Sequence, residues 1–163
     1  MNGSRMTQRR AFVSHMVGLL AAGLAGRRLW ALSPYLAGDP TPISVWKSST
    51  CACCAKWVDH IRANGFAPVI RDEEEMERLK DKLGVPSGVR SCHTARLEGY
   101  LIEGHVPASD IRRLLAEKPK AAGLAVPEMP SHTPGMAPPG AEPGDFDVLV
   151  FQSDGSTRIF ASH

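Results

Sequence analysis

The sequence predicts a mixed α/β domain in which helices flank a central sheet. Short β-branched runs alternate with amphipathic helical patterns between residues 43 and 116. Two further strand-like runs, 146–151 and 157–161, surround Asp154-Gly155 and predict a C-terminal hairpin. The length of 163 residues suits one domain with a hydrophobic core, and 43% hydrophobic with 22% charged residues is ordinary for a globular protein.

The N-terminal segment 1–37 has the composition of a targeting signal rather than of a folded domain. It carries five arginines and no acidic residue. The pair Arg9-Arg10, then Phe12 and an apolar run over 17–25, resembles a bacterial export signal of the twin-arginine type. The run is short for a membrane span, so we expect a cleaved signal, with an uncleaved anchor as the alternative.

The predicted cleavage site has two positions that fit. The tripeptides 23–25 and 35–37 both end in a small residue, so the sequence does not choose between them. We expect residues 38–42 to be a linker and 43–163 to be the folded domain, located in the periplasm and free of the membrane once the signal is removed.

The charge of the folded part excludes one class of partner. Of the 19 basic residues, five are the arginines of 1–37, which leaves 14 against 17 acidic residues. A mildly acidic body offers no basic surface for nucleic acid.

The first predicted elements are a strand over 43–46 and a helix that follows it. Ser48, Ser49 and Thr50 are all suitable N-cap residues. The apolar positions of the helix follow a helical spacing and are Cys54, Trp57, Val58 and Ile61. Asn64-Gly65 then ends the helix.

A strand over 67–70 and a second helix come next. Glu73, Glu74 and Glu75 are expected in the first helical turn, where acidic side chains complement the helix dipole. The expected buried positions are Met76, Leu79 and Leu83. Gly84 and Pro86 close the helix.

The third part of the pattern is a hairpin, 93–97 and 100–103, followed by a helix. Pro107 and Ser109-Asp110 begin this helix, and its apolar positions are Ile111, Leu114 and Leu115. The order of elements up to residue 116, with cysteines at the start of the first helix, resembles a thioredoxin-like fold, and such an analogy does not by itself give a function.

Residues 119–144 form a segment of different character. Seven prolines and four glycines within it argue against any helix or strand interior. Because a predicted hairpin follows, we expect this proline-rich loop to lie across the domain rather than to extend from it.

Three of the four cysteines, Cys51, Cys53 and Cys54, lie where the first strand gives way to the first helix. The free N–H groups at a helix N-terminus favour the thiolate form. Accessible thiolates serve either soft-metal binding or disulfide exchange. Cys51 and Cys54 have the C-x-x-C spacing of thiol–disulfide oxidoreductases, with Cys51 as nucleophile and Cys54 as resolving thiol. Cys53 would compete in that exchange, whereas a metal cluster gains from a third thiolate.

Cys92 completes the set if the thioredoxin-like topology holds, because the turn before the third strand then lies beside the first helix. Four thiolates suit zinc, an iron–sulfur cluster or Cu(I). Structural zinc sites use separated C-x-x-C pairs, whereas the crowded C-x-C-C motif favours bridging thiolates in a multinuclear Cu(I) cluster. Two structural disulfides are the alternative, but cysteines clustered at the start of one helix constrain little of the chain, and a short loop closed there stabilises little.

Other soft ligands are His105, Met129 and Met136. The two methionines lie in the proline-rich loop, where they either bind metal or cover the domain. His93 follows Cys92 and can face either side of its strand, whereas His60 is expected at the surface.

These motifs together resemble the CopG-type family. The matching segments are Val45-Trp46-Lys47-Ser48, Cys51-x-Cys53-Cys54, Trp57-Val58-Asp59-His60, Ser91-Cys92-His93-Thr94-Ala95, Gly99-Tyr100, Ile102-Glu103-Gly104-His105-Val106-Pro107 and the loop with Met129 and Met136. The resemblance covers about residues 43 to 163. Ser49 and Ala52 stand where proline and glycine are familiar, which affects loop stiffness rather than the ligands.

The resemblance implies an exported bacterial metal-binding protein of thioredoxin-like fold that takes part in copper resistance. It implies a thiolate-bridged multinuclear copper cluster on Cys51, Cys53, Cys54 and Cys92, with activity as a copper oxidoreductase. Sequestration of Cu(I), redox cycling, and transfer to another periplasmic copper-handling or electron-transfer protein remain open at this point. The rival function is thiol–disulfide exchange through Cys51 and Cys54.

Overall fold

The computed structural model describes residues 40–138 and 144–163, which belong to one compact unit, Ala37–His163. The predicted export signal, 1–37, lies outside the described residues. Within the described part of the chain, no helix has the length and apolar content needed to cross a membrane.

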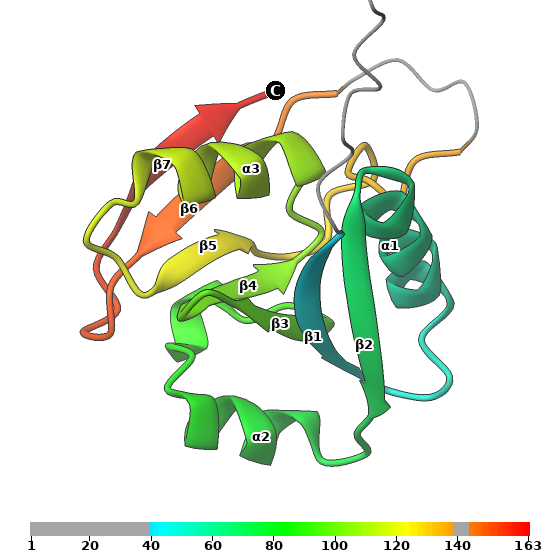
Figure 1. Cartoon of the computed structure of the whole chain (residues 1–163). Helices are drawn as coiled ribbons and strands as arrows, with labels where there is room; N and C mark the ends of the chain where they lie inside the picture. The colour runs from blue at the N-terminus through cyan, green and yellow to red at the C-terminus, as the bar shows by residue number, and fades with distance from the viewer. Residues whose placement is uncertain (1–39, 139–143) are drawn as a thin grey trace, which may run out of the picture. The chain divides into compact units, whose positions relative to one another are not determined.

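The domain is built on one seven-stranded mixed sheet of order β2-β1-β3-β4-β5-β6-β7 (Figure 1). The strands are β1 (Thr41–Lys47), β2 (Phe66–Asp72), β3 (His93–Leu97), β4 (Tyr100–Gly104), β5 (Gly123–Val126), β6 (Asp147–Phe151) and β7 (Thr157–Ser162). The pairs β1–β2 and β4–β5 are parallel, and the other neighbouring pairs are antiparallel. The predicted mixed α/β class, both hairpins and the flanking helices are confirmed. The more specific thioredoxin-like assignment stays a prediction.

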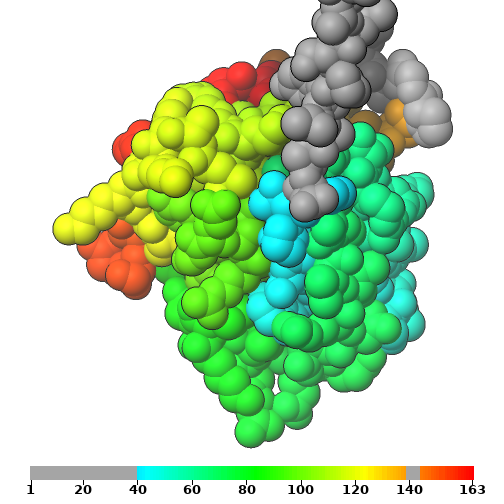
Figure 2. Space-filling model, viewed as in Figure 1, coloured from blue at the N-terminus to red at the C-terminus, as the bar shows by residue number. Residues whose placement is uncertain are grey.

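Three α-helices cover the two faces of the sheet: α1 (Ala52–Ala63), α2 (Met76–Leu83) and α3 (Ala108–Glu117), with a short 3₁₀ helix at Ser87–Val89. Helices α1 and α3 share the larger core, to which Trp57, Ile61 and Ile111 contribute. The smaller core, on the side of α2, contains Val85, Leu101 and Phe151. Figure 2 shows the cyan surface of the β1 region between the green surfaces of neighbouring segments.

The first strand and helix form largely as predicted. Strand β1 begins at Thr41, so the last two residues of the predicted linker belong to it. The buried residues of α1 are the four expected, Cys54, Trp57, Val58 and Ile61. The helix ends at Ala63 with Asn64 as its C-cap, and Gly65 takes a left-handed φ of +83°, a conformation that glycine adopts at little cost.

The prediction for α2 was wrong in two respects. The helix begins at Met76, so Glu73, Glu74 and Glu75 precede its first turn. Met76, Leu79 and Leu83 are only half-buried, and the one fully buried residue of α2 is Lys80. The spacing of apolar residues could not predict the burial of Lys80, because a lysine is buried only where the fold supplies an oppositely charged partner.

The prediction of an irregular segment over 119–144 was wrong for 123–126, which form the buried strand β5 between β4 and β6. Gly123 permits this pairing, because a Cβ atom there would overlap the carbonyl oxygen of Leu101. Further along, the loop lies against α1 as expected. A Cβ atom added at Gly135 would lie 2.7 Å from the backbone nitrogen of Trp57 and 2.9 Å from the backbone oxygen of Cys53, both in α1.

His60 was expected at the surface, but it is half-buried between two helices. Its Nε2 accepts a hydrogen bond of 3.1 Å from the backbone N–H of Ala108, the first residue of α3. Pro107, the N-cap residue of α3, offers no side-chain cap, so His60 of α1 supplies the missing acceptor.

This contact makes stability depend on pH. Burial, with Arg112 nearby, lowers the pKa of His60. Below the usual histidine pKa of about 6.5, the unfolded chain therefore binds a proton that the folded chain does not, and stability falls as the pH drops. We expect His60→Gln, which keeps an acceptor but does not titrate, to lose less stability than the native chain between pH 7.5 and pH 5.5. Urea unfolding at the two pH values measures the loss of stability in each protein. The other histidines are the same in both proteins, so their effect is common to the comparison. Equal losses of stability would contradict the prediction.

Gly135 supports a second stability prediction. Its φ is +88°, and an alanine methyl would overlap the backbone of α1. We expect Gly135→Ala to lower the free energy of unfolding by about 2–4 kcal/mol, from overpacking together with the left-handed conformation. Gly155→Ala is the matched control, since Gly155 has a φ of +86° but its added Cβ would meet only Pro86 at 3.7 Å. Thermal or urea unfolding of both variants should separate them; an equal cost would mean that the contact with α1 is unimportant.

Candidate metal centre

The site begins at the N-terminus of α1, where Cys51 is the N-cap residue. The Sγ atom of Cys51 accepts a hydrogen bond of 3.4 Å from the N–H of Cys54. The cap thus lies one residue beyond the predicted candidates Ser48, Ser49 and Thr50. A sulfur in this position lies at the positive end of the helix dipole, which favours a thiolate when the cysteine is reduced.

The sulfur atoms of Cys51, Cys53, Cys54 and Cys92 all lie within 4.8 Å of one another. Cys51 and Cys54 form a disulfide, whereas Cys53 and Cys92 are free thiols. Cys53 Sγ is 3.5 Å from Cys51 Sγ. Cys54 is fully buried and the other three are half-buried, so the cluster lies at the edge of the core and within reach of the surface.

Strand pairing explains how the distant Cys92 reaches α1. Strand β3 runs antiparallel to β1, and its first residue, His93, is opposite Lys47, the last residue of β1. The residue before β3 therefore lies beside the turn that enters α1. The predicted convergence of the four cysteines is present in the structure.

A second group of potential ligands shares Cys92 with the first. The donor atoms of Cys92, His93 and His105 also lie within 4.8 Å of one another. His105 Nε2 is 3.1 Å from Cys92 Sγ, and His105 Nδ1 is 2.7 Å from the carbonyl oxygen of Pro134. Since a carbonyl only accepts, Nδ1 carries the proton and Nε2 presents its lone pair toward Cys92, as in a metal-binding histidine.

His93 is a candidate ligand that the sequence left undecided. Its Nδ1 is 3.2 Å from Cys92 Sγ, and its ring lies 4.3 Å from that of Trp57. The imidazole is fully buried, and its Nε2 has no hydrogen-bond partner among the described residues. The neighbouring cysteine was the only signal in the sequence, because strand alternation alone did not tell which side the ring would face.

Burial controls the protonation of these groups. It raises the pKa of the Cys92 thiol to about 12, and the nearby Cys53 adds to the effect. Burial also lowers the pKa of His93, well below its usual value, and that of His105. At neutral pH the site is therefore a neutral thiol beside neutral imidazoles, and a bound cation would displace the thiol proton.

The two methionines occupy different positions. Met136 is half-buried and follows Gly135, whose backbone touches α1 near Cys53. Met129 is 39% exposed, and it follows Glu128 in a stretch where both residues have positive φ. The structure thus brings the segment of Met136 to the cysteine helix and leaves Met129 at the surface.

The donor set selects a class of metal. Thiolate sulfur and imidazole nitrogen suit Cu(I) and zinc, whereas Mg²⁺ and Ca²⁺ require oxygen ligands, which neither group supplies. The residues present therefore fit a soft metal ion.

Comparison with known proteins agrees with this chemistry. A family model described as "Protein of unknown function, DUF411" matches residues 89–136, and no curated protein matches. Two solved structures, "Copper resistance protein copG- Form 2" and "Form 1", are each 38% identical to this chain, with a TM-score of 0.70. The matches cover 77% of this chain and 99% and 98% of those chains, respectively. With such identity over nearly the whole of its relatives, this chain belongs to the family of the copper resistance protein CopG.

Proposed function

We propose that this protein binds Cu(I) in the periplasm as a thiolate-bridged multinuclear cluster and thereby supports copper resistance. The observation that carries the proposal is the convergence of four cysteine sulfurs within 4.8 Å. Three of them lie on one helix end and the fourth comes from another element, so the cysteines surround one locus. Such crowding suits sulfurs that bridge between metal ions, and Cu(I) prefers soft ligands of this kind.

His105 is the nitrogen ligand in this proposal, because its Nε2 lone pair faces Cys92. Met136 adds a thioether from the loop that lies on α1, and Met129 adds one at the exposed outer side. Thioethers and imidazoles both accept Cu(I).

The Cys51–Cys54 disulfide must open before four thiolates are available. Its reduction takes up two electrons and two protons and yields two thiols. We infer a periplasmic electron-transfer or copper-handling protein as the partner that supplies the electrons. Storage of Cu(I), redox turnover and transfer to such a partner would all use these ligands.

Thiol–disulfide exchange is the second candidate function, and the disulfide itself favours it. The bond joins the residues of the C-x-x-C pair at a helix N-terminus, where Cys51 would be the attacking thiolate and Cys54 the resolving thiol. Cys53, 3.5 Å from the Cys51 sulfur, is the competing thiol in this reaction.

Copper loading separates the two candidates. We expect the reduced protein, kept free of air, to bind several Cu(I) ions per chain in competition with a chromophoric chelator. Cys92→Ser should lose most of this copper, because it removes the sulfur that faces the three on α1. Ser87→Ala, in the 3₁₀ helix, is the control and should bind as the native chain does. No tight copper, together with insulin reduction that is abolished by Cys51→Ser, would instead establish the oxidoreductase.

The additional ligands have their own test. We expect His105→Asn to weaken Cu(I) binding at least about tenfold, equivalent to ~1.4 kcal/mol, because it removes the imidazole nitrogen that faces Cys92. Met136→Leu should weaken binding more than Met129→Leu, since position 136 lies nearer to the cysteine helix. Chelator competition gives the affinities, and His60→Gln controls for a general effect of losing a histidine. An unchanged affinity in His105→Asn would exclude His105 from the ligand set.

A further inference from the structure

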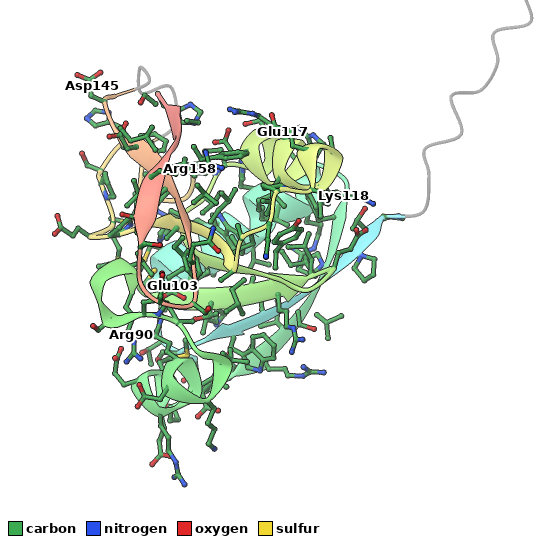
Figure 3. All side chains as sticks on the ribbon, turned by 90° about the vertical axis from the view of Figure 1, so that its left-hand side faces the viewer. Arg90, Glu103, Glu117, Lys118, Asp145 and Arg158 are labelled. Carbon is green, nitrogen blue, oxygen red and sulfur yellow. A yellow bond between two sulfur atoms is a disulfide. The ribbon has the colours of Figure 1, made fainter. Side chains whose placement is uncertain are left out.

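A buried ion pair joins helix α2 to strand β4 beneath the start of β3. Lys80 is 1% exposed and Glu103 is 0% exposed, and Lys80 Nζ bonds directly to Glu103 Oε1. Figure 3 shows Glu103 within the domain. Charged side chains are rarely buried to this extent, so the contacts of this pair indicate what it does.

Within the part of the chain that the structure describes, the other side-chain hydrogen bonds of the pair all go to the segment that carries Cys92. Lys80 Nζ donates to the carbonyl oxygen of Ser91 at 2.8 Å and to Thr94 Oγ1 at 3.2 Å. Glu103 Oε1 accepts from the backbone N–H of Ser91 at 2.7 Å, and Oε2 accepts from the Thr94 hydroxyl at 2.6 Å. Both backbone polar groups of Ser91 are thus bound by the pair, and Thr94 is bound on the other side of Cys92.

Gly104 brings the same segment close to β4. Its φ is +72°, and a Cβ there would lie 2.5 Å from Ser91 Oγ and 2.6 Å from the carbonyl oxygen of Val126. Glu103, Gly104 and His105 therefore act on the Cys92 segment in succession: the first binds Ser91, the second permits its close approach, and the third faces the Cys92 sulfur.

Fold stability does not by itself account for the pair. Replacing a buried ion pair with apolar residues of similar volume is often neutral or stabilising, because the charges no longer have to be desolvated. The hydrogen bonds to Ser91 and Thr94, in contrast, fix the two sides of a half-buried cysteine whose place relative to α1 matters for a shared metal.

We propose that Lys80 and Glu103 are positioning residues of the metal centre. They hold Ser91 and Thr94 so that Cys92 Sγ stays within bridging distance of the three sulfurs on α1. This inference rests on the proposed Cu(I) function, and it predicts that the pair can be removed with the fold retained but with Cys92 lost from the ligand set.

The test uses the full domain, reduced and loaded with Cu(I) without air. Each cysteine is then alkylated with iodoacetamide and quantified by mass spectrometry, and folding is followed by circular dichroism. Lys80→Met combined with Glu103→Leu removes both charges at similar volume. Arg90→Met is the matched control. Arg90, labelled in Figure 3, is the residue before Ser91 and also pairs with α2, through Glu77 at 2.8 Å and Asp81 at 2.5 Å, but within the described part of the chain it makes no hydrogen bond to Ser91.

In the native protein and in Arg90→Met, we expect Cu(I) to protect all four cysteines. In the folded double variant, Cys51, Cys53 and Cys54 should stay protected while Cys92 becomes reactive, and Cu(I) affinity should fall about 10-fold to 100-fold, the usual effect of losing residues that orient a ligand. Lys80→Met with Glu103→Gln keeps an acceptor for the N–H of Ser91 and should restore part of the protection.

The outcomes distinguish this inference from the function on which it rests. Equal protection of Cys92 in the native chain and in the folded Lys80→Met, Glu103→Leu variant would overturn the positioning role and leave the copper site intact. Lack of Cys92 protection in the native chain would refute the proposed cluster. Failure of both double variants to fold would also overturn the inference, because the pair would then be a requirement of the fold.

Discussion

The antiparallel pairing of β1 with β3 is the constraint on which the site depends. It places His93 opposite Lys47, and so brings the residue before β3 to the turn that enters α1. Without this register, Cys92 and the cysteines of α1 would be separated by the width of a strand or more. The buried pair of Lys80 and Glu103 lies under the same junction, so the sheet and the smaller core both support one short segment.

Most of the fold could be predicted from local pattern. The strands before α2, the β3–β4 hairpin, α3 and the C-terminal hairpin follow from hydrophobic spacing and turn residues, and the structure has them. Strand β5 was missed because its four residues lie among prolines and include Gly123, whose role is to let β4 approach. His60 was expected at the surface, and Lys80 was not among the residues predicted to be buried, since the burial of both depends on partners at positions 103 and 108 that no local pattern can supply.

The sequence located the centre of the site better than its surroundings. Four cysteines and His105 were singled out by chemical type and by family resemblance. The structure brings the four sulfur atoms together and places His105 Nε2 3.1 Å from Cys92 Sγ. The sequence left the orientation of His93 undecided and did not predict the Lys80–Glu103 pair, because a histidine on a strand or a lysine on a helix has no special role in most proteins. Only the three-dimensional contacts show that they touch Cys92 or its neighbours.

The hydrogen bond between His105 and Pro134 has a consequence for how such sites can diverge. Its acceptor is a main-chain oxygen, so the tautomer of His105 is encoded by the path of the loop and not by any particular side chain at position 134. Relatives could replace that proline freely and retain the same imidazole chemistry as long as the backbone keeps its course. Gly135 leaves no room for a methyl group. We therefore expect glycine at this position to be what preserves the backbone path of the loop when other loop residues change.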